Sequence, residues 1–394
     1  MPMLERRRIW FVGIGGAGLS GYAVLAAAWG AEVAGWDRAE TPYLAYVRAA
    51  GIPVTVAPDP PEPPTGAEVV VSTAFAGRVE GKSRAEFLAE LVSLRRAIVV
   101  AGAHGKTTTA AMIAFCLDRL GLDPAFLIGG EVPQLGGNAR AGAGWLVVEG
   151  DESDRTVAAL RPQIAVLTNA ELDHHATFAS PAELEALFDA WLEHVPQVVR
   201  GEQLEPADVQ LAVPGEHNRR NAACALAALE LAGVAYGDAA RVLAEFSGVR
   251  RRLELRGELD GAQVYDDYGH HPSEIAAALA AVRASPNGRL LVLFQPHLYS
   301  RTRHLARELA AALAAADAAC VTDVYPARED PVDCVSGKLV ADALAELSPG
   351  MPVGWAPTVE DGVSFLRRRA RAGDTILVVG AGDVDRAVPL LVDQ

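Results

Sequence analysis

Short runs of apolar, often β-branched residues recur along the chain and alternate with longer stretches rich in alanine and leucine. Such runs are typical of buried strands, and their alternation with helical stretches predicts βαβ units built around parallel sheets. The pattern therefore predicts an α/β protein. The expected strands are 9–12, 32–36, 68–72, 97–101, 125–128, 145–148, 164–168, 263–265, 289–294, 319–322 and 375–379.

The spacing of these elements predicts three domains. One composition break follows the alanine-rich helix expected at 222–232, where three arginines occupy 250–252. Length supports the division, because 394 residues, 51% of them apolar, are enough to fill two or three separate cores. We expect domains over 1–96, 97–248 and 249–394.

One segment allows a different interpretation. Three arginines at 6–8 precede 23 residues without a charge, 9–31, and this arrangement resembles a signal anchor. Six glycines interrupt the run, and four of them lie at 13, 15, 16 and 18. They predict a strand, a tight turn and a helix from about 19 to about 29 instead. No membrane insertion is therefore expected.

Charge and cysteine usage restrict the class of partner. A net charge of −15 and a pI near 5.1 argue against binding to nucleic acid or acidic lipid, because a phosphate polymer would be repelled over most of the surface. The four cysteines form no CxxC pair and have no zinc-type spacing, which predicts reduced thiols in a cytoplasmic protein. Any phosphate ligand must be bound locally.

A glycine-rich loop, 13–18 with the sequence Gly-Ile-Gly-Gly-Ala-Gly, lies between the first expected strand and helix. Its main-chain N–H groups and the helix N-terminus could bind a pyrophosphate. Asp37, at the end of the second expected strand, could accept a hydrogen bond from a ribose hydroxyl. From this motif alone, two other interpretations remain open: a tight turn that binds no ligand, and a nicotinamide dehydrogenase, which would show the same fingerprint.

A second glycine-rich loop, 102–105, follows the expected strand 97–101 and precedes an apolar helix. Here backbone amides could surround a phosphate, Lys106 could reach the transferred phosphoryl group, and the Thr107 hydroxyl could ligate Mg²⁺. The spacing departs from strict GxxxxGK[ST], since Val100 stands in the first position. The chain has 32 arginines and only three lysines, so a lysine in this loop indicates that a compact ammonium is needed.

Acidic residues and histidines follow two later expected strands, at 149–154 and 169–175. In parallel sheets ligands bind at the carboxyl ends of the strands, and Mg²⁺ bound with a nucleotide uses one or two carboxylates. A magnesium-nucleotide site is therefore expected at this edge. A solvated acidic turn and surface histidines are the alternative interpretation.

Seven motifs then occur in one order over nearly the whole chain, and this order resembles the Mur ligases of peptidoglycan synthesis. Within that family it is most similar to the branch that adds L-alanine to UDP-N-acetylmuramate. The motifs are GIGGAGLSG at 13–21, GAHGKTTT at 102–109, EGDESD at 149–154, TNAELDH at 168–174, PGEHNRRNA at 214–222, DDYGHHP at 266–272 and FQPH at 294–297.

The resemblance implies a Rossmann-like N-terminal domain that binds the uridine diphosphate, and a central P-loop ATPase domain with a mostly parallel sheet, shortened here. It also implies a C-terminal Rossmann-like α/β domain that closes over the amino acid. The implied cofactors are ATP and Mg²⁺, and the implied substrates are UDP-N-acetylmuramate and L-alanine. The muramoyl carboxylate would attack the γ-phosphate, and alanine would attack the resulting acyl phosphate. A monomer or homodimer is expected.

The resemblance also implies roles for individual residues. The catalytic residues would be Lys106, Glu149, His174, Arg252, Asp267 and His270, with Thr107, Glu149 and His174 as metal ligands. ATP would contact Gly102, His104, Gly105, Lys106, Thr107, Thr108, His217, Asn218, Asn221, Asp267 and Arg252, or its neighbour Arg251. The substrates would contact Gly13, Gly15, Gly16, Ala17, Gly18, Ser20, Asp37, Ser72, Tyr268, His270, His297 and Arg301.

Two departures from the family pattern leave alternatives open. Leu298 stands where the alanine-adding branch usually carries a second arginine, and only 38 residues separate His175 from Pro214. The first departure allows a sibling ligase that attaches a recycled peptide to the same sugar nucleotide. The second allows a shortened, non-catalytic relative that binds nucleotide.

Overall fold

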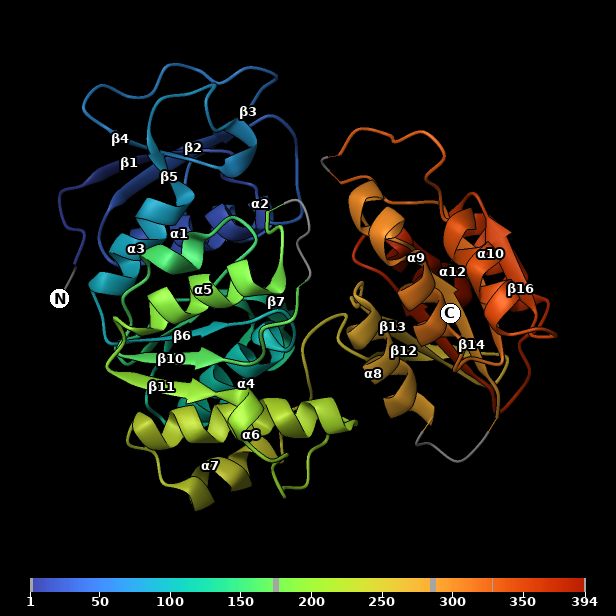
Figure 1. The fold of residues 1–394 in the computed structure, drawn as a ribbon. Helices are drawn as coiled ribbons and strands as arrows, with labels where there is room; N and C mark the ends of the chain where they lie inside the picture. Colours follow the sequence, from blue (N-terminus) through green and yellow to red (C-terminus); the bar gives the residue numbers. More distant parts are fainter. Residues whose placement is uncertain (1–2, 173–176, 284–287, 328, 393–394) are drawn as a thin grey trace. The chain divides into compact units, whose positions relative to one another are not determined.

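The computed structural model describes residues 3–172, 177–283, 288–327 and 329–392. Within these ranges the chain forms three β-sheets that follow one another along the sequence, each with its own helices (Figure 1). The predicted α/β class with mostly parallel sheets is confirmed. Residue contacts divide the chain into two compact units. The first comprises Met1–Glu171, Pro181–Val209 and Arg220–Phe246, and the second comprises Leu172–Ser180, Gln210–Arg219 and Ser247–Gln394.

The first sheet has five parallel strands in the order β3-β2-β1-β4-β5. The chain adds β2 and β3 on one side of β1 and then places β4 on the other side, so the strand order reverses between β1 and β4. Open α/β sheets bind ligands at such a reversal. The elements are β1 (Arg8–Val12), α1 (Ala17–Ala28), β2 (Glu32–Asp37), α2 (Leu44–Ala49), β3 (Val54–Val56), β4 (Glu68–Val71), β5 (Lys82–Ser83) and α3 (Arg84–Ser93).

The uncharged run 9–31 folds into β1, a turn and α1, as its glycines predict. The helix begins two residues earlier than expected, at Ala17, because Gly16 has an extended backbone and serves as the N-cap. None of the described helices combines the length and the apolar character that a bilayer-spanning helix needs.

The second sheet has six strands in the order β11-β10-β6-β9-β7-β8, and only the β7–β8 pair is antiparallel. Its central strand, β6, is fully buried and is flanked by β10 and β9. The elements are β6 (Ala97–Ala101), α4 (Lys106–Arg119), β7 (Ala125–Val132), β8 (Gly137–Arg140), β9 (Leu146–Glu149), β10 (Ile164–Leu167), α5 (Pro181–Leu192), β11 (Gln197–Arg200), α6 (Glu216–Leu231) and α7 (Tyr236–Leu243).

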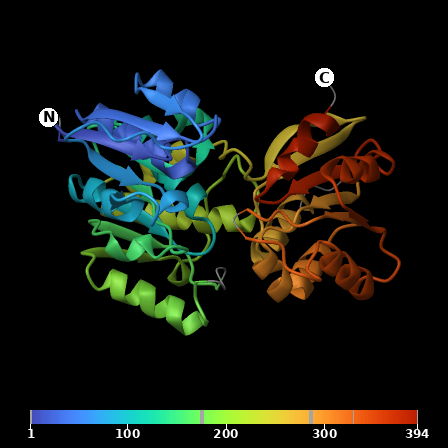
Figure 2. The ribbon, with the colours of Figure 1, turned by 90° about the horizontal axis from the view of Figure 1, so that it is seen from above.

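The third sheet also has six strands, in the order β12-β13-β17-β14-β15-β16, and only β12–β13 is antiparallel. Helices cover both of its faces (Figures 1 and 2). The elements are β12 (Glu254–Leu259), β13 (Ala262–Asp267), α8 (Pro272–Arg283), β14 (Leu290–Phe294), α9 (Tyr299–Leu313), β15 (Ala318–Thr322), α10 (Lys338–Leu347), β16 (Val353–Ala356), α11 (Val359–Arg367), β17 (Thr375–Val379) and α12 (Ala387–Leu391).

Strand β14 shows why this sheet is apolar on both faces. Val292 and Phe294 pack in the core formed with α8, α9 and α10, whereas Leu291 and Leu293 pack in the core formed with α11 and α12. Successive side chains of a strand point to opposite faces, so a strand covered on both faces reads as a continuous apolar run. This is the signal by which the sequence predicted the strand.

The predicted domain boundaries fall in gaps between described elements. Helix α3 ends at Ser93 and β6 begins at Ala97, while α7 ends at Leu243 and β12 begins at Glu254. Each of the three sheets therefore lies within one predicted domain. The contact division groups the first two sheets in one unit, and the boundaries at 96 and 248 both stay predictions.

Candidate active site

The first glycine loop lies at the carboxyl end of β1, beside the reversal point of its sheet. Gly13 has a φ of +82°, and a Cβ atom there would lie 2.4 Å from the Ser72 Oγ atom. Only glycine therefore fits, and it brings the loop against the residue that follows β4. The structure thus places Ser72 and the predicted loop, with its members Gly15, Gly16, Ala17 and Gly18, at one edge.

Asp37 supports this loop from the end of β2. Its Oδ2 atom accepts a hydrogen bond of 2.8 Å from the Gly15 N–H group, and the Thr41 hydroxyl donates to the Gly15 carbonyl at 2.8 Å. Asp37 is buried, so its carboxylate first stabilises the loop, and its predicted contact with a ribose hydroxyl stays a prediction. Ser20 is also buried, and its hydroxyl donates to the Ala17 carbonyl at 3.3 Å within α1.

The second glycine loop connects β6 to α4 and is enclosed by residues from other segments. Gly102 has a φ of +128°, and a Cβ atom there would lie 2.3 Å from the Thr168 Oγ1 atom. Gly105 has a φ of +77°, and its Cβ would lie 2.2 Å from the Asn221 Oδ1 atom. Both glycines are therefore required, and the predicted nucleotide residue Asn221 lies directly beside the loop.

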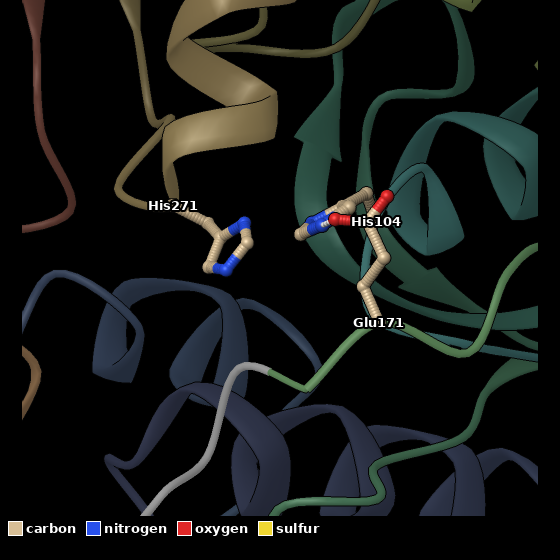
Figure 3. Close-up of side chains that lie close together, drawn as sticks. All are labelled: His104, Glu171 and His271. Atoms are coloured by element: carbon tan, nitrogen blue, oxygen red, sulfur yellow. Dashed lines mark hydrogen bonds and ion pairs between the residues drawn. The ribbon is translucent and has the colours of Figure 1, made fainter. Parts of the chain in front are cut away.

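The peptide groups of His104 are held by the amide side chain of Asn169, which follows β10. The His104 N–H group donates to Asn169 Oδ1 at 3.0 Å, and Asn169 Nδ2 donates to the His104 carbonyl at 2.9 Å. The His104 ring contacts Glu171, with 3.1 Å between Nε2 and Oε2 (Figure 3). These contacts hold the loop in place within the protein itself.

Lys106, the first residue of α4, turns back toward the loop. Its ammonium donates to the Gly102 carbonyl at 2.5 Å, to the Ala103 carbonyl at 3.1 Å and to Glu152 Oε1 at 3.0 Å. Burial alone would lower the pKa of Lys106, but the charges of Glu152 and Glu149 outweigh burial and raise it. Lys106 is therefore a fixed cation beside the loop that the sequence predicts to bind phosphate.

Glu152, which pairs with Lys106, is a candidate site residue that the sequence did not single out. Its side chain is 2% exposed, and burial raises its pKa to about 7. It lies in the acidic run after β9, which drew attention as a group. The sequence predicts one metal ligand in this run, Glu149, and nothing in the spacing identifies the carboxylate that turns inward.

Thr107 and Glu149 form an oxygen-rich pair next to Lys106. The Thr107 hydroxyl donates to Glu149 Oε1 at 3.0 Å, and Glu149 Oε2 accepts from the Gly129 N–H group at 2.7 Å. Hydroxyl and carboxylate oxygens suit Mg²⁺, which takes one or two protein carboxylates beside nucleotide phosphates. The donor set therefore fits the predicted ion.

Thr108, also predicted to contact ATP, is buried in the first turn of α4. The third predicted ligand, His174, lies outside the described residues.

Two other predicted nucleotide residues, His217 and Asn218, lie in the first turn of α6. Asn218 Nδ2 donates to the Pro214 carbonyl at 2.7 Å, and Gly215 has a φ of +101° where the chain turns into the helix. Burial lowers the pKa of His217, and the charge of Arg252 adds to the effect. The imidazole is therefore neutral at pH 7, which suits contact with a nucleobase.

Two arginines that precede β12, Arg251 and Arg252, make different contacts. Arg251 donates to the Gly380 carbonyl at 2.8 Å and lies 3.5 Å from an Asp266 carboxylate oxygen, so it ties the start of the sheet to the end of β17. Arg252 lies 3.6 Å from Glu274 Oε1, with its guanidinium carbon 5.3 Å from the centre of the Tyr268 ring. Because Arg251 is committed to this backbone, Arg252 is the better candidate for the predicted phosphate contact.

Asp267 is buried at the end of β13 and accepts two backbone hydrogen bonds. The N–H groups of Leu253 and Gly269 each donate to it at 2.7 Å. Burial nonetheless raises the pKa of Asp267 to about 6, although the charge of Arg252 acts in the opposite direction. The carboxyl therefore fixes the local turn, and its predicted role at the ATP site stays a prediction.

This buried carboxyl predicts a measurable pH dependence. The pKa of Asp267 rises from 3.8 to about 6 on folding, so the folded protein binds a proton more readily than the unfolded chain. The free energy of unfolding should then fall as the pH rises from about 4 to about 6. Over this pH range we expect the free energy of unfolding of Asp267→Asn to decrease by about 3 kcal/mol less than that of the unaltered protein. Urea unfolding of both proteins across this range measures it, and equal slopes would contradict the prediction.

The predicted amino-acid residues form a row of rings in the second unit. The ring centres of Tyr268 and His270, and those of His270 and His297, are each 5.8 Å apart. His297 stacks on Tyr325, with 5.8 Å between centres and 12° between planes, and Arg301 NH1 lies 3.2 Å from His297 Nδ1. The structure thus brings all four predicted residues of this group together.

Tyr325 was not predicted from the sequence. It lies beyond β15, and its N–H group donates to the Pro296 carbonyl at 2.9 Å, while the Leu298 N–H group donates to the Tyr325 carbonyl at 3.0 Å. It therefore fixes the loop that carries His297. Its place just beyond a parallel strand's carboxyl end was the available signal.

Leu298 is the N-cap of α9 and has a φ of +71°, a conformation that costs a non-glycine residue about 1–3 kcal/mol. The family resemblance implies that an arginine at this position binds the carboxylate of an alanine substrate. On that basis we expect Leu298→Arg to lower the KM for alanine by roughly tenfold to a hundredfold, through a second charge-assisted hydrogen bond. Initial-rate kinetics with varied alanine measures this change. Leu298→Gln, which adds no charge, is the matched control, and an equal effect of both variants would contradict the explanation.

Three family descriptions match consecutive parts of this chain. "Mur ligase family, catalytic domain" matches 8–96, "Mur ligase middle domain" matches 100–197, and "Mur ligase, glutamate ligase domain" matches 251–382. The first and third matches span the first and third sheets, and the middle match spans the second sheet except for the start of β6 and the end of β11. The resemblance on the seven motifs is therefore confirmed along the chain.

Relatives and solved structures agree with these matches. The UDP-N-acetylmuramate–L-alanine ligase of Renibacterium salmoninarum is 39% identical over 450 positions, which cover 98% of this chain and 95% of that protein. The alignment is longer than this chain, so the relative carries segments that the chain lacks. The structure of the UDP-N-acetylmuramate–alanine ligase of Thermotoga maritima matches with a TM-score of 0.81 and 27% identity, over 98% of each chain.

A murein peptide ligase of Psychrobacter arcticus matches with a TM-score of 0.65 over 98% of this chain and all of that one. Its identity is 23%, so this likeness shows the fold alone. The three domain matches and the 39% identity to a full-length relative decide the family. The chain belongs to the Mur ligase family.

Proposed function

We propose that the protein joins L-alanine to the muramoyl carboxylate of UDP-N-acetylmuramate and converts ATP to ADP and phosphate, with Mg²⁺ as cofactor. The observation that carries this proposal is the phosphate loop. Lys106 is mostly enclosed there as a cation, with Thr107 and Glu149 beside it as an oxygen pair for a metal. The relatives' names support the substrates, since a relative 39% identical over 98% of the chain is a UDP-N-acetylmuramate–L-alanine ligase.

In the proposed reaction a carboxylate oxygen of the sugar nucleotide forms a bond to the γ-phosphorus, and the bond to the β,γ-bridging oxygen breaks to release ADP. Lys106 stabilises the charge on the moving phosphoryl group, and Thr107 and Glu149 would hold the magnesium ion that neutralises the phosphates. The alanine amine then attacks the acyl carbon. Phosphate leaves, a proton is released, and an amide remains.

The alanine would be bound by the ring cluster of the second unit. Arg301 is 3% exposed, and its guanidinium lies beside His297, an arrangement suited to a carboxylate. His270 is oriented by the contact of its Nδ1 atom with the Tyr268 carbonyl at 3.1 Å. We propose that His270 faces the amine of alanine, which must lose its proton before or during the attack.

One assay tests the proposal. ADP formation should require UDP-N-acetylmuramate, Mg²⁺ and L-alanine together, and UDP-N-acetylglucosamine, which lacks the lactyl carboxylate, should not replace the substrate. ADP formed with no amino acid acceptor and no muramoyl carboxylate would contradict it. ATP binding without turnover in any mixture would instead favour a non-catalytic relative. The six-stranded second sheet and its ordered phosphate loop support catalysis.

The sibling that attaches a recycled peptide remains the second candidate, because Leu298 removes one expected carboxylate partner. Comparing free alanine with a tripeptide as acceptor distinguishes the two activities.

We also propose a cytoplasmic location, since ATP is available there and the cysteines are unpaired in the described structure, as a reducing compartment requires. A monomer or homodimer remains the expectation.

A further inference from the structure

Arg84 is a cation to which neither the sequence motifs nor the family matches assign a role. It is the first residue of α3, and the capping box of Ser83 and Glu86 fixes the start of this helix. Its side chain is 26% exposed, so it is mostly enclosed but still accessible. It reaches toward two segments of the proposed active site.

The first of these segments is the start of α1, directly after the glycine loop. A Cβ atom on Gly18 would lie 3.8 Å from the guanidinium carbon of Arg84, an ordinary van der Waals distance, so the arginine lies directly beside the start of α1. Helix α1 has no side-chain cap at Gly16 and no acidic residue in its first turn. The positive end of the helix and the guanidinium therefore lie side by side, which favours an anion.

The second segment is the acidic run after β9. Arg84 NH2 lies 3.6 Å from Asp151 Oδ2, and Arg84 Nε lies 3.8 Å from Asp154 Oδ2. Both distances exceed a direct hydrogen bond. The same run carries Glu152, which holds Lys106 of the phosphate loop at 3.0 Å. Arg84 thus lies between the loop proposed for the sugar nucleotide and the segment that borders the loop proposed for ATP.

The guanidinium also hydrogen-bonds with the side chain of the buried Tyr22, but one of its donors is not satisfied by the described residues. Its Nε–H group is buried and has no hydrogen-bond acceptor among the residues that the structure describes. A buried donor without an acceptor is costly, and a guanidinium fork matches the paired oxygens of a phosphate or a carboxylate. A ligand that supplies such oxygens at this place would satisfy the arginine.

We propose that Arg84 binds an anionic oxygen group of the sugar-nucleotide substrate, the diphosphate or the lactyl carboxylate, and so directs the reacting acid toward the phosphate loop. This inference rests on the proposed function, because that function supplies the ligand. The diphosphate and the lactyl carboxylate both offer the paired oxygens that a guanidinium binds. Uridine ligands that lack the lactyl group carry the diphosphate alone, so a set of such ligands distinguishes the two.

Titration calorimetry on the full-length protein tests the proposal, with UDP-N-acetylmuramate, UDP-N-acetylglucosamine, UDP and ATP as separate ligands. We expect Arg84→Ala to weaken UDP-N-acetylmuramate binding roughly tenfold to a hundredfold and to leave ATP binding within about twofold of the original value. Arg84→Lys should lie between, because it keeps the charge but loses the fork. An equal loss for all three uridine ligands assigns the diphosphate, and a loss for UDP-N-acetylmuramate alone assigns the carboxylate.

Two control variants separate binding from a structural role. Arg8→Ala removes an exposed arginine at the amino end of β1, opposite the glycine loop, and should leave all four affinities unchanged. Asp154→Asn removes one ion pair of Arg84 and should not weaken the sugar nucleotide. If Asp154→Asn reproduces the loss of Arg84→Ala, the arginine acts only through the acidic run and the proposal is wrong.

Failure of the inference and failure of the proposed function are distinguishable. If the unaltered protein binds UDP-N-acetylmuramate and Arg84→Ala binds it equally well, the inference alone is overturned. If the unaltered protein binds ATP but none of the uridine ligands, the proposed function is overturned with it. The thermal midpoint of each variant checks that the fold is retained.

Discussion

Replacing Lys106 with alanine is expected to lower kcat for ADP formation by about 10²–10³-fold, the range seen when one preorganised charge at a developing anion is removed. The ammonium is held by two backbone carbonyls and by Glu152, so its position is set before ATP binds. The moving phosphoryl group would lose its fixed cation. Steady-state ADP release at saturating substrates measures the effect.

The lysine content of the chain offers a matched control. Lys338 lies at the start of α10, is more than half exposed and pairs with Asp342 at 2.6 Å. We expect Lys338→Ala to keep full activity. Should Lys106→Ala retain kcat within a few-fold of the unaltered enzyme, the phosphate loop would not be the site of transfer and the proposed reaction would have to be abandoned.

The second large effect is expected from Glu152→Ala, and it should appear first as lost stability. The variant leaves the Lys106 ammonium, 16% exposed, without its carboxylate partner. Removing one partner of a buried ion pair costs about 3–5 kcal/mol, because an uncompensated charge remains. Two carbonyl acceptors stay in place, so we expect about 3 kcal/mol less free energy of unfolding near pH 8. Urea denaturation measures it.

Added nucleotide provides a check that is specific to this site. The phosphates of MgATP would supply the negative charge that the variant lacks, so MgATP should raise the unfolding free energy of Glu152→Ala more than that of the unaltered protein. Glu152→Gln, which keeps the shape and a neutral acceptor, should lie between the two. Equal stability of Glu152→Ala and the unaltered protein would show that Glu152 does not hold Lys106.

The sequence predicted the interior of every sheet and none of the edges. Among the residues that the structure describes, the eleven expected strands correspond to the eleven interior strands. The six described strands that the sequence missed are the two outermost of each sheet: β3, β5, β8, β11, β12 and β16. Interior strands of parallel sheets are buried on both faces and read as apolar runs. Edge strands such as β3, with the sequence Val-Thr-Val and two exposed residues, have no such signal.

The sequence could predict a site residue where a suitable residue type follows a recognisable strand and loop. Lys106 and Thr107 follow a strand and a glycine loop, so the sequence alone locates them. Glu152 could not be distinguished from its acidic neighbours, since the turn after β9 decides which carboxylate points inward. Tyr325 reaches His297 only through the pairing of segments far apart in sequence. A motif supplies the residue types, and the packing of the chain decides what each side chain contacts.

Asp37 illustrates the same limit. The sequence predicted a carboxylate for a ribose hydroxyl, and the structure shows that this carboxylate accepts from the Gly15 and Arg38 N–H groups, both at 2.8 Å. A carboxylate at a strand end can hold the loop, the ligand or both. Spacing does not separate these roles, because each needs an acidic residue at the same place.

The edge strand β12 has a consequence for solubility. It carries the charged residues Glu254, Arg256 and Glu258, and its pairing with β13 is interrupted by a shift of register between Leu255 and Gly257. Charge and irregularity on an outer strand discourage the backbone of a second molecule from continuing the sheet. We therefore expect the protein to resist fibre-like stacking along this edge when it is concentrated.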